Sequence, residues 1–446
     1  YELCEEAEQA RSVYEEMVAY ARQIGATAVE CVGLNRLAAL HGMALFDLDK
    51  AFALLEQAWA VAERTGDRRA MAETAQNLSG AAGHSHDIDN ELRYAQQAFA
   101  LARELEHPQL LANCARRLAY VYPGLREWEL VERYAFEAKQ RFEALGNFML
   151  ANDVQRLLGA SQMQNGRPQE SLETLKQAFA FIQQVENDWE QADVARFLAL
   201  VYAELGQYGQ AIQLVSEAVD KARRANHPLI TIPLSAAQVV YRAALALDAS
   251  QEAGRAIVEA FDNGGFDPFP DLALAELCAV HALREEWHEA YVYAKKVVAF
   301  HASGSLPPMG LTGWYETEAL LRGGDGELAR AEVTRIAKTV KSVRYRLPLL
   351  RSQAVLAEWD GDVAQAIAHL EAALALAREM GLPGEEWMIL GELGRLYAGQ
   401  EDQENARKAY RKAGTIIHCL AETMDDQLLR EGFLTAALVR SCLLYT

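Results

Sequence analysis

Proline is scarce in this chain, with 11 copies in 446 residues. Because proline breaks helix interiors while alanine, leucine, glutamate and arginine favour them, the composition predicts a nearly all-helical protein. Cysteine is also rare, and its six copies show neither CxxC spacing nor paired spacing. We therefore expect buried thiols in a reducing compartment rather than a disulfide framework. The six are Cys4, Cys31, Cys114, Cys278, Cys419 and Cys442.

Long apolar runs and an excess of positive charge are both missing. No stretch approaches the ~20 apolar residues of a membrane span, and the chain does not open with a signal peptide. Lys and Arg (43) are outnumbered by Asp and Glu (63), and the net charge of -20 opposes binding to nucleic acid or to an anionic membrane. We expect a cytoplasmic protein. Since it opens at Tyr1 rather than at methionine, we interpret it as a fragment of a longer chain.

Motifs for catalysis and cofactor binding are absent as well. The sequence contains no GxxxxGKS/T, GxGxxG, HExxH or GxSxG, and residues 323–326 (GGDG) lack the lysine of a phosphate-binding loop. The run His84-Ser85-His86-Asp87 holds possible metal ligands but has no helical histidine partner, so we interpret it as a solvated loop. The sequence therefore predicts no enzyme, no metal site and no cofactor.

A repeat of 40 residues is the strongest feature that the sequence does contain. Alanine recurs at this step without a slip, leucine forms a second column, and small residues form a third. A fixed period of this length indicates a solenoid of stacked supersecondary units. With 51% apolar residues we expect one core running along the chain. The columns are Ala58, Ala98, Ala138, Ala178 and Ala218; Leu78, Leu118, Leu158 and Leu198; and Ala39, Ser79, Ala119, Gly159 and Ala199.

Each unit is predicted to be a hairpin of two antiparallel helices, A and B. In the fifth unit Asp188 caps helix A, which runs through Asp193–Leu205; Gly206 ends it, and helix B covers residues 210–225. Residues 1–446 are predicted to form a single array, with regular repeats over 1–225, degenerate repeats over 226–345, and two regular repeats plus a capping helix over 346–446. Units are expected to start near Ala26, Asp67, Pro108, Asn147 and Asn187, with turns at Gly25, Gly66, His107-Pro108, Gly146 and His227-Pro228. Further expected features are an orphan helix B at 5–24, chain breakers at 264–270 and 304–310, helices at 271–285, 287–302, 313–323 and 326–341, and a last helix at 424–443.

Two of the units resemble the tetratricopeptide repeat. Its pattern of Leu-Gly, Tyr, Gly, Ala, an aromatic or aliphatic residue and Ala is matched by Leu198-Ala199, Tyr202, Gly206, Ala211, Val215 and Ala218, and again by Leu393-Gly394, Tyr397, Ala406, Tyr410 and Ala413. The period differs, about 40 residues rather than 34, and the leading Trp of the pattern is missing. The resemblance implies an all-α, right-handed α-solenoid of about ten helical hairpins with a C-terminal capping helix.

Repeats of this length look like those in the sensor arrays of bacterial signal-transduction ATPases, the class that contains the maltose-regulon activator. The segments at 372–383 and 429–434 are similar to the C-terminal end of such regulators. This resemblance implies a nucleotide-binding domain ahead of Tyr1. The present chain would then be the effector-sensing or partner-binding arm.

Two ladders of polar residues repeat on helix A, which lines the concave face in tetratricopeptide folds. The ladders lie on one helical face, because residues three apart are neighbours there, and guanidinium groups at this spacing could hold carboxylates, phosphates or peptide carbonyls. The alternative is that they form ion pairs within each helix. Tyr120 is either an aromatic anchor beside the ladders or a packing residue. The ladders are Arg36, Gln76, Arg116, Arg156 and Arg196, and Glu73, Asn113, Asp153 and Asp193.

The sequence thus favours a scaffold that binds a protein, a peptide or possibly a small effector, and that possibly forms a homo-oligomer. A structural spacer or oligomerisation module with no ligand is the alternative. An enzyme with a cleft at residues 262–313 is a third hypothesis. We interpret the tryptophans as inter-repeat packing residues rather than as a cofactor site; they are Trp59, Trp128, Trp189, Trp287, Trp314, Trp359 and Trp387.

Overall fold

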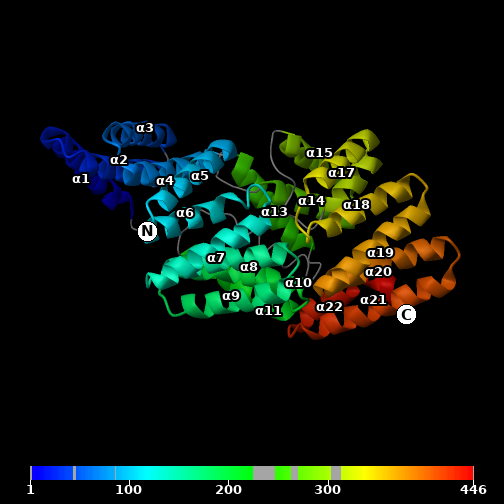
Figure 1. Cartoon of the computed structure of the whole chain (residues 1–446). Helices are drawn as coiled ribbons and strands as arrows, with labels where there is room; N and C mark the ends of the chain where they lie inside the picture. The colour runs from blue at the N-terminus through cyan, green and yellow to red at the C-terminus, as the bar shows by residue number, and fades with distance from the viewer. Residues whose placement is uncertain are drawn as a thin grey trace. The chain divides into compact units, whose positions relative to one another are not determined.

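The computed structural model describes residues 3–43, 47–85, 87–224, 247–262, 270–302 and 313–444, and within these it is built from α-helices. The chain packs into two compact units, residues 1–161 and 162–446. Each unit is described by itself below. Helices are labelled as in Figure 1. The all-α helical repeat predicted from the sequence is confirmed.

The first unit consists of consecutive helical hairpins. The main packing is between each helix A and the helix B that follows it, as in α2–α3, α4–α5 and α6–α7. Successive A helices also touch, α2 with α4 and α4 with α6. The helices are α1 (Leu3–Ile24), α2 (Thr27–Met43), α3 (Leu48–Thr65), α4 (Arg68–His84), α5 (Ile88–Glu104), α6 (Pro108–Val121), α7 (Trp128–Ala144) and α8 (Phe148–Gln164), the last of which continues into the second unit.

The second unit repeats the same hairpin plan over a longer stretch of chain. The predicted helices of the degenerate region are confirmed to within a few residues. Its helices are α9 (Pro168–Ile182), α10 (Asp188–Glu204), α11 (Tyr208–Arg224), α13 (Leu247–Asp262), α14 (Pro270–Leu283), α15 (Trp287–Ala302), α16 (Gly313–Arg322), α17 (Gly326–Thr339), α18 (Arg346–Trp359), α19 (Val363–Met380), α20 (Pro383–Gly399), α21 (Gln403–Glu422), α22 (Gln427–Thr435) and α23 (Ala437–Leu443).

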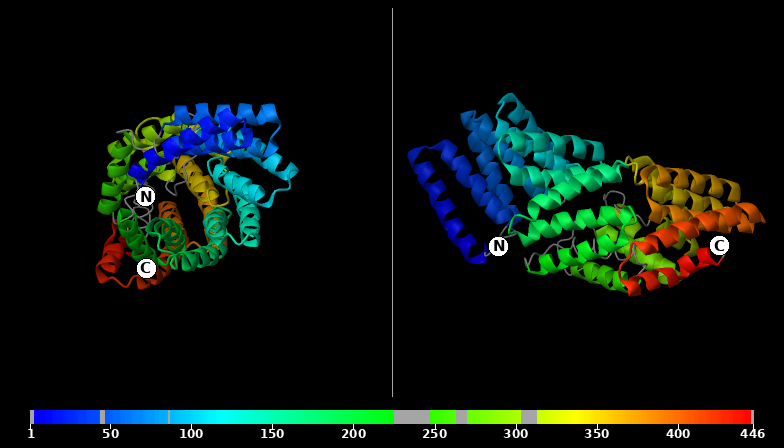
Figure 2. Two further views of the ribbon diagram at one scale, coloured as in Figure 1. Left: turned by 90° about the vertical axis from the view of Figure 1, so that its left-hand side faces the viewer. Right: turned by 90° about the horizontal axis from the view of Figure 1, so that it is seen from below.

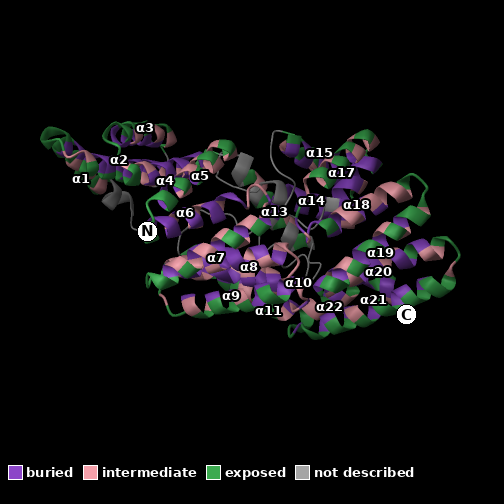
Figure 3. Ribbon diagram, viewed as in Figure 1, coloured by how far each residue is buried: buried purple, intermediate pink, exposed green. Residues whose placement is uncertain are grey.

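The alanine column lies in the buried core of both units. In the first unit Ala58, Ala98 and Ala138 are completely buried, and in the second unit so are Ala178 and Ala218. A larger side chain there would push neighbouring backbones apart. Buried residues follow the helix faces that meet within and between hairpins, while exposed residues cover the outer faces (Figure 3).

The helix ends follow the residues that the repeat places there. Gly25, Gly66, Gly146 and Gly206 adopt positive φ, between 67° and 74°, which glycine reaches without strain. Aspartates begin many helices by accepting a hydrogen bond from the backbone N–H three residues further on. These caps are Asp47, Asp67, Asp87, Asp362 and Asp402.

Two local expectations are wrong. The N-cap of α10 is Asn187, whose side chain accepts from the N–H of Glu190, and not Asp188. Asp188 is the first helical residue and its carboxylate instead accepts from Arg224 on α11 at 2.9 Å and 3.2 Å. Asn187 has the extended backbone that a cap requires, and this fixes which residue caps.

The second correction concerns the last helix, which is broken at Ala436 into α22 and α23. Phe433, Val439 and Cys442 are all buried. At 3.6 residues per turn a straight helix would direct Val439 and Cys442 away from the side on which Phe433 lies. The extended backbone of Ala436 (φ −56°, ψ 138°) redirects the chain so that all three are covered.

Most described cysteines agree with the expectation of buried thiols. Cys31, Cys114, Cys278 and Cys442 are buried and unpaired, but Cys419 is exposed. The side chain of Cys4, residue His86, the turn at His227-Pro228 and the breakers at 264–269 and 304–310 lie outside the described part of the chain. In the ranges that are described, no helix combines the length and apolarity needed to cross a membrane.

Within the second unit the α10–α11 turn packs against helices far along the sequence. Thr423, at the end of α21, accepts the backbone N–H of Tyr208 at 3.2 Å, and its hydroxyl lies 3.1 Å from the carbonyl oxygen of Gly206. The Tyr208 ring meets Phe433 of α22 edge to face, with centroids 6.1 Å apart. Figures 1 and 2 show α10 and α11 beside α21 and α22. We call this contact the clasp.

Candidate functional site

Three of the predicted ladder residues and the neighbouring Tyr120 meet in the first unit, on α6 and α8. Arg116 donates from Nε to Asp153 at 2.6 Å, and Tyr120 donates its hydroxyl to the same carboxylate. Arg156, one turn along α8 from Asp153, donates to that carboxylate at 3.2 Å and to the Tyr120 hydroxyl at 2.9 Å. The four side chains therefore form one network in which each group contacts another member.

In this network, burial and the neighbouring charges shift the pKa of Asp153 in opposite directions. Burial raises the pKa of Asp153, but Arg156 and Arg116 outweigh it and hold the pKa of that carboxyl below its ordinary value. Burial also raises the pKa of Tyr120 to about 12. Arg156 is only 7% exposed. A guanidinium held in this way is poorly placed to grip a ligand, because it would first have to leave Asp153.

The remaining ladder residues are dispersed. In the first unit Arg36 is exposed on α2, and Gln76 lies 3.9 Å from the Cys114 thiol. Glu73 and Asn113 each contact a residue of their own helix: Glu73 accepts from Arg69 at 3.0 Å, and Asn113 accepts from Gln109 at 3.2 Å. In the second unit Arg196 donates to Asp193 of the same helix at 2.6 Å and lies 4.0 Å from the centre of the Phe197 ring. Some ladder residues thus form ion pairs within a helix, as the alternative interpretation of the ladders predicted. Others form one network that joins two helices.

A groove in the second unit is a candidate site, with a volume of about 1010 Å³. Its walls come from the successive A helices α14, α16, α18 and α20, and α23 closes one side. We call it the A-helix groove. Its residues are Ala282, Leu283, Glu285, Trp287, Trp314, Tyr315, Glu318, Arg322, Ala354, Val355, Glu358, Trp359, Leu370, Trp387, Met388, Gly391, Glu392, Arg395, Leu396, Tyr410, Ala437, Leu438, Ser441 and Cys442.

Aromatic rings supply much of the groove wall. Trp314 and Trp387 are almost fully buried behind it, whereas Trp359 is 52% exposed and presents its ring to solvent. Met388 of α20 adds a flexible apolar side chain to the same wall. Large aromatic anchors with an adaptable methionine are typical of surfaces that bind protein segments.

Carboxylates outnumber guanidiniums along the groove. Glu318 accepts from Arg322 one turn further along α16 at 2.9 Å, and Glu358 of α18 accepts from both Nη atoms of Arg395 on α20 at 2.6 Å. Burial raises the pKa of Glu318, opposed by Arg322 and reinforced by the nearby charge of Glu392. Since the buried Arg351 also pairs with Glu392, the groove keeps an excess of one carboxylate, Glu285, which a positive ligand group would complement.

A chain of buried charges lies behind this wall. Arg351 lies 3.4 Å from the centre of the Trp314 ring and donates to Glu392 in the groove and to Glu385 at 3.0 Å. Arg344 then donates to Glu385 at 2.7 Å and to Glu204 of α10 at 2.9 Å. Both guanidiniums are 1% exposed. The network fixes the position of α20 between the groove and α10.

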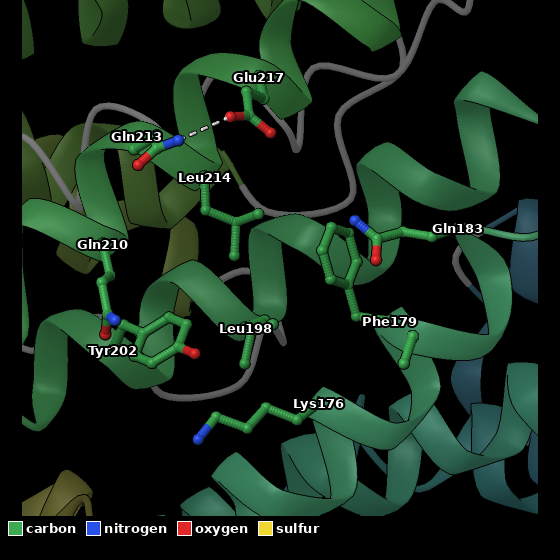
Figure 4. Close-up of a pocket in the computed structure, with 10 residues that line it drawn as sticks. Lys176, Phe179, Gln183, Leu198, Tyr202, Gln210, Gln213, Leu214 and Glu217 are labelled. Atoms are coloured by element: carbon green, nitrogen blue, oxygen red, sulfur yellow. Dashed lines mark hydrogen bonds between the residues drawn. The ribbon is translucent and has the colours of Figure 1, made fainter.

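A second, smaller groove of about 270 Å³ lies where α9, α10 and α11 meet (Figure 4). Leu198 and Tyr202 form its floor, with Phe179 on one side and Leu214 on the other. At 3.6 residues per turn, this face of α10 is opposite to the face that carries the ladder residue Arg196. The small groove is therefore not the site that the ladders predicted.

Comparison with known families gives one match: residues 150–224 match the tetratricopeptide repeat family. This stretch of the chain therefore resembles tetratricopeptide repeats. The match begins in α8 and ends with α11, so it includes the fifth unit from which the resemblance was drawn. The specific likeness to sensor arrays of bacterial ATPases is not shown by this match. No curated protein sequence matches the chain.

Solved structures resemble these tetratricopeptide repeats only distantly. BtubC (BKLC) from P. vanneervenii is 19% identical and matches 49% of this chain and 92% of its own, with a TM-score of 0.44. The quorum sensor NprR from B. thuringiensis, in its apo form, is 15% identical over 80% of this chain and 99% of its own, with a TM-score of 0.47. A Rap protein complexed with Competence and Sporulation Factor is 13% identical over 90% and 99%, with a TM-score of 0.44.

The A-helix groove was not found from the sequence. Four of its residues were assigned to packing between repeats, which agrees with the buried Trp314 and Trp387 and with Trp287, partly buried against the core, but not with Trp359, which is 52% exposed. The usable signal was the recurrence of a carboxylate beside a cation or an aromatic ring on α16, α18 and α20. It was hidden because the repeats there depart from the 40-residue step. In the described ranges no cluster of three His, Cys, Asp or Glu side chains is arranged to hold a metal ion.

Proposed function

We propose that this chain is a binding scaffold whose A-helix groove takes a protein segment of basic and apolar composition. The observation that carries the proposal is the groove itself, about 1010 Å³ in volume and walled by helices of successive repeats. Pockets of this size with aromatic walls and a few polar groups are the usual ligand sites of proteins.

Each of three successive A helices adds a glutamate and a cation or aromatic ring to the wall, which favours a polymeric ligand over a compact one. Glu318 is followed by Arg322 on α16, Glu358 by Trp359 on α18, and Glu392 by Arg395 on α20. A peptide presents side chains at regular steps and can use each of these positions in turn. A small effector would use only one.

The charge of the groove favours a ligand that carries positive charge. Four glutamates line it, Glu285, Glu318, Glu358 and Glu392, against the two arginines Arg322 and Arg395. Both arginines already pair with groove carboxylates, and the buried Arg351 pairs with Glu392, so an excess of one carboxylate remains. Lysine or arginine side chains between large apolar ones therefore complement the site best.

Fluorescence anisotropy with three labelled peptides of equal length tests the proposal. One alternates Leu, Arg and Trp, one has Glu in place of Arg, and one has Ser in place of Leu and Trp. We expect the full chain to bind the first and to bind the other two at least tenfold more weakly, with affinity falling as salt is added.

Two variants localise the binding. Trp359→Ala removes an exposed ring of the groove and should weaken the Leu-Arg-Trp peptide about tenfold or more. Phe136→Ala is the matched control, because Phe136 is 51% exposed in the first unit and is not a groove residue. Equal binding of all three peptides, or an equal loss in both variants, would overturn the proposal.

The signalling role stays part of this proposal. A tetratricopeptide scaffold with one ligand groove suits the sensor arm of a larger bacterial signalling protein, the role that the sequence resemblance implies. The polar ladders of Arg116, Arg156 and Arg196 stay a second candidate for a ligand. They enter the test as a triple alanine variant, which should retain binding of the Leu-Arg-Trp peptide if the A-helix groove is the site.

An assembly role is the second candidate function, favoured by α1. Val13, Tyr20 and Ile24 lie on one face of this helix and are 58% to 63% exposed. An apolar stripe of this kind favours self-association. Light scattering on the full chain and on Tyr20→Glu tests it: a concentration-dependent oligomer that the substitution dissolves supports assembly, and a monomer at all concentrations contradicts it.

A further inference from the structure

The short helix α23 forms one wall of the A-helix groove. Ala437, Leu438, Ser441 and Cys442 line the groove on the side of α20, after the backbone break at Ala436 has turned the chain toward it. The helix has 7 residues. A helix this short is not stable by itself, so its position depends on what it packs against.

A glycine lets α23 approach α20 closely. A Cβ atom added at Gly391 would lie 2.8 Å from the Sγ atom of Cys442, nearer than side chains normally pack. Val439 and Cys442 are buried, at 0% and 2% exposure, and are the buried residues of this helix. The approach to α20 is thus close, and α23 is also held by packing against α21 and α22.

The composition of α23 is that of the ligand proposed for the groove. Its sequence, ALVRSCL, is apolar with a single arginine, Arg440, which is exposed. Leu438 takes part in the groove wall, as a leucine of a bound segment would. The chain therefore supplies a segment of similar composition at the end of its own binding site, and Leu438, but not Arg440, is among the residues that line the groove.

We propose that α23 is an intramolecular competitor, which occupies the α20 end of the groove and must be displaced by a segment that runs along it. This inference rests on the proposed function, because it assigns a regulatory element to the same groove. It makes the affinity for external ligands lower than the groove alone would give, since binding must also detach α23.

Truncation after Thr435 tests the proposal directly. The truncated chain should bind the Leu-Arg-Trp peptide about tenfold more tightly than the full chain, and it should bind a labelled synthetic peptide of residues 436–444 in which Ser replaces Cys442. The full chain should not bind this second peptide, because α23 already holds its place. Equal or weaker binding of the Leu-Arg-Trp peptide by the truncated chain would overturn the proposal.

Failure of the proposed function gives a different pattern. If the groove does not take external basic segments, neither form binds the Leu-Arg-Trp peptide, while the truncated chain still binds the 436–444 peptide. If only the competitor role is wrong, both forms bind the Leu-Arg-Trp peptide with the same affinity. The two peptides therefore separate the two claims.

A reversible disulfide between α20 and α23 tests the competitor role of α23 if truncation disturbs folding. In a Cys419→Ser background, Gly391→Cys puts a thiol close enough to Cys442 for a disulfide, whose S–S bond of about 2.05 Å removes the clash of an unbonded side chain. The oxidised protein should lose most of its affinity for the Leu-Arg-Trp peptide, and reduction should restore it. Equal affinity before and after reduction would contradict the proposal.

Discussion

Asp153 is the residue on which the polar network of the first unit depends. It accepts hydrogen bonds from Arg116, Arg156 and Tyr120. Asp153→Asn removes the buried negative charge that Arg116 and Arg156 share, and we expect unfolding free energy to fall by roughly 3–5 kcal/mol. Urea unfolding measures this. In the control Glu73→Gln, the lost pair with Arg69 is exposed, so a loss of about 1 kcal/mol or less is expected; equal losses would show that the network is not a buried one.

Glu332 is a single residue that makes the stability of the fold depend on pH. Burial raises the pKa of Glu332, but Arg335 and His301, which lies 2.7 Å away, outweigh it and lower the pKa to about 2. A carboxyl whose folded pKa is below its unfolded value of about 4.3 adds stability above that value, and the gain is lost as pH falls toward 2. Thermal unfolding from pH 5 to pH 2 should show this loss, and Glu332→Gln should make it smaller; an unchanged slope would contradict the pairing.

The ladder residues show which features of the site could be predicted from the sequence. The 40-residue register correctly placed Asp153, Arg156 and Tyr120 on helix A of neighbouring units. It could not show that they contact one another, because Arg116 and Asp153 belong to different helices and the distance between those helices depends on packing. A column of polar residues is thus compatible with an open ladder and with a closed network.

At the scale of elements, the clasp joins helices that are distant in the sequence. A Cβ at Gly209, in the first turn of α11, would collide with the backbone carbonyl oxygen of Thr423. Gly209→Ala must separate the two elements, and we expect a loss of about 1–3 kcal/mol in unfolding free energy. Gly80→Ala is the control: Gly80 lies inside α4 with no atom in reach of an added Cβ, so a gain of up to about 1 kcal/mol is expected. Urea unfolding of both variants checks the clasp, and a stabilised Gly209→Ala would contradict it.

The elements themselves were largely predictable, but the clasp was not. Gly206 was recognised as a turn because glycine at the end of an amphipathic stripe has a local meaning. The reason for Gly209 lies more than two hundred residues away, at Thr423, and periodicity contains no information about it. The break at Ala436 was missed for the same reason: alanine favours helix, and only the need to bury Phe433 and Val439 together overrides that preference.

At the scale of the molecule, the constant repeat period predicts the fold. The binding groove instead lies where the repeats differ from one another in spacing and in side chains. The alanine column predicted the helical hairpins because each copy meets the same packing requirement. The A-helix groove is built mainly from helices between α14 and α20, where the spacing varies and the residues at equivalent positions differ. Its ligand therefore depends on particular side chains such as Trp359 and Glu318, which the repeat does not specify.

Backbone hydrogen exchange of the full chain, with and without the Leu-Arg-Trp peptide, tests the central claim most directly. The account predicts slower exchange on binding in α16, α18 and α20, where Glu318, Glu358 and Glu392 line the groove. It also predicts faster exchange in α23 as that helix is displaced. Protection confined to α4, α6 and α8 would instead locate the ligand at the polar ladders and contradict the assignment of the A-helix groove.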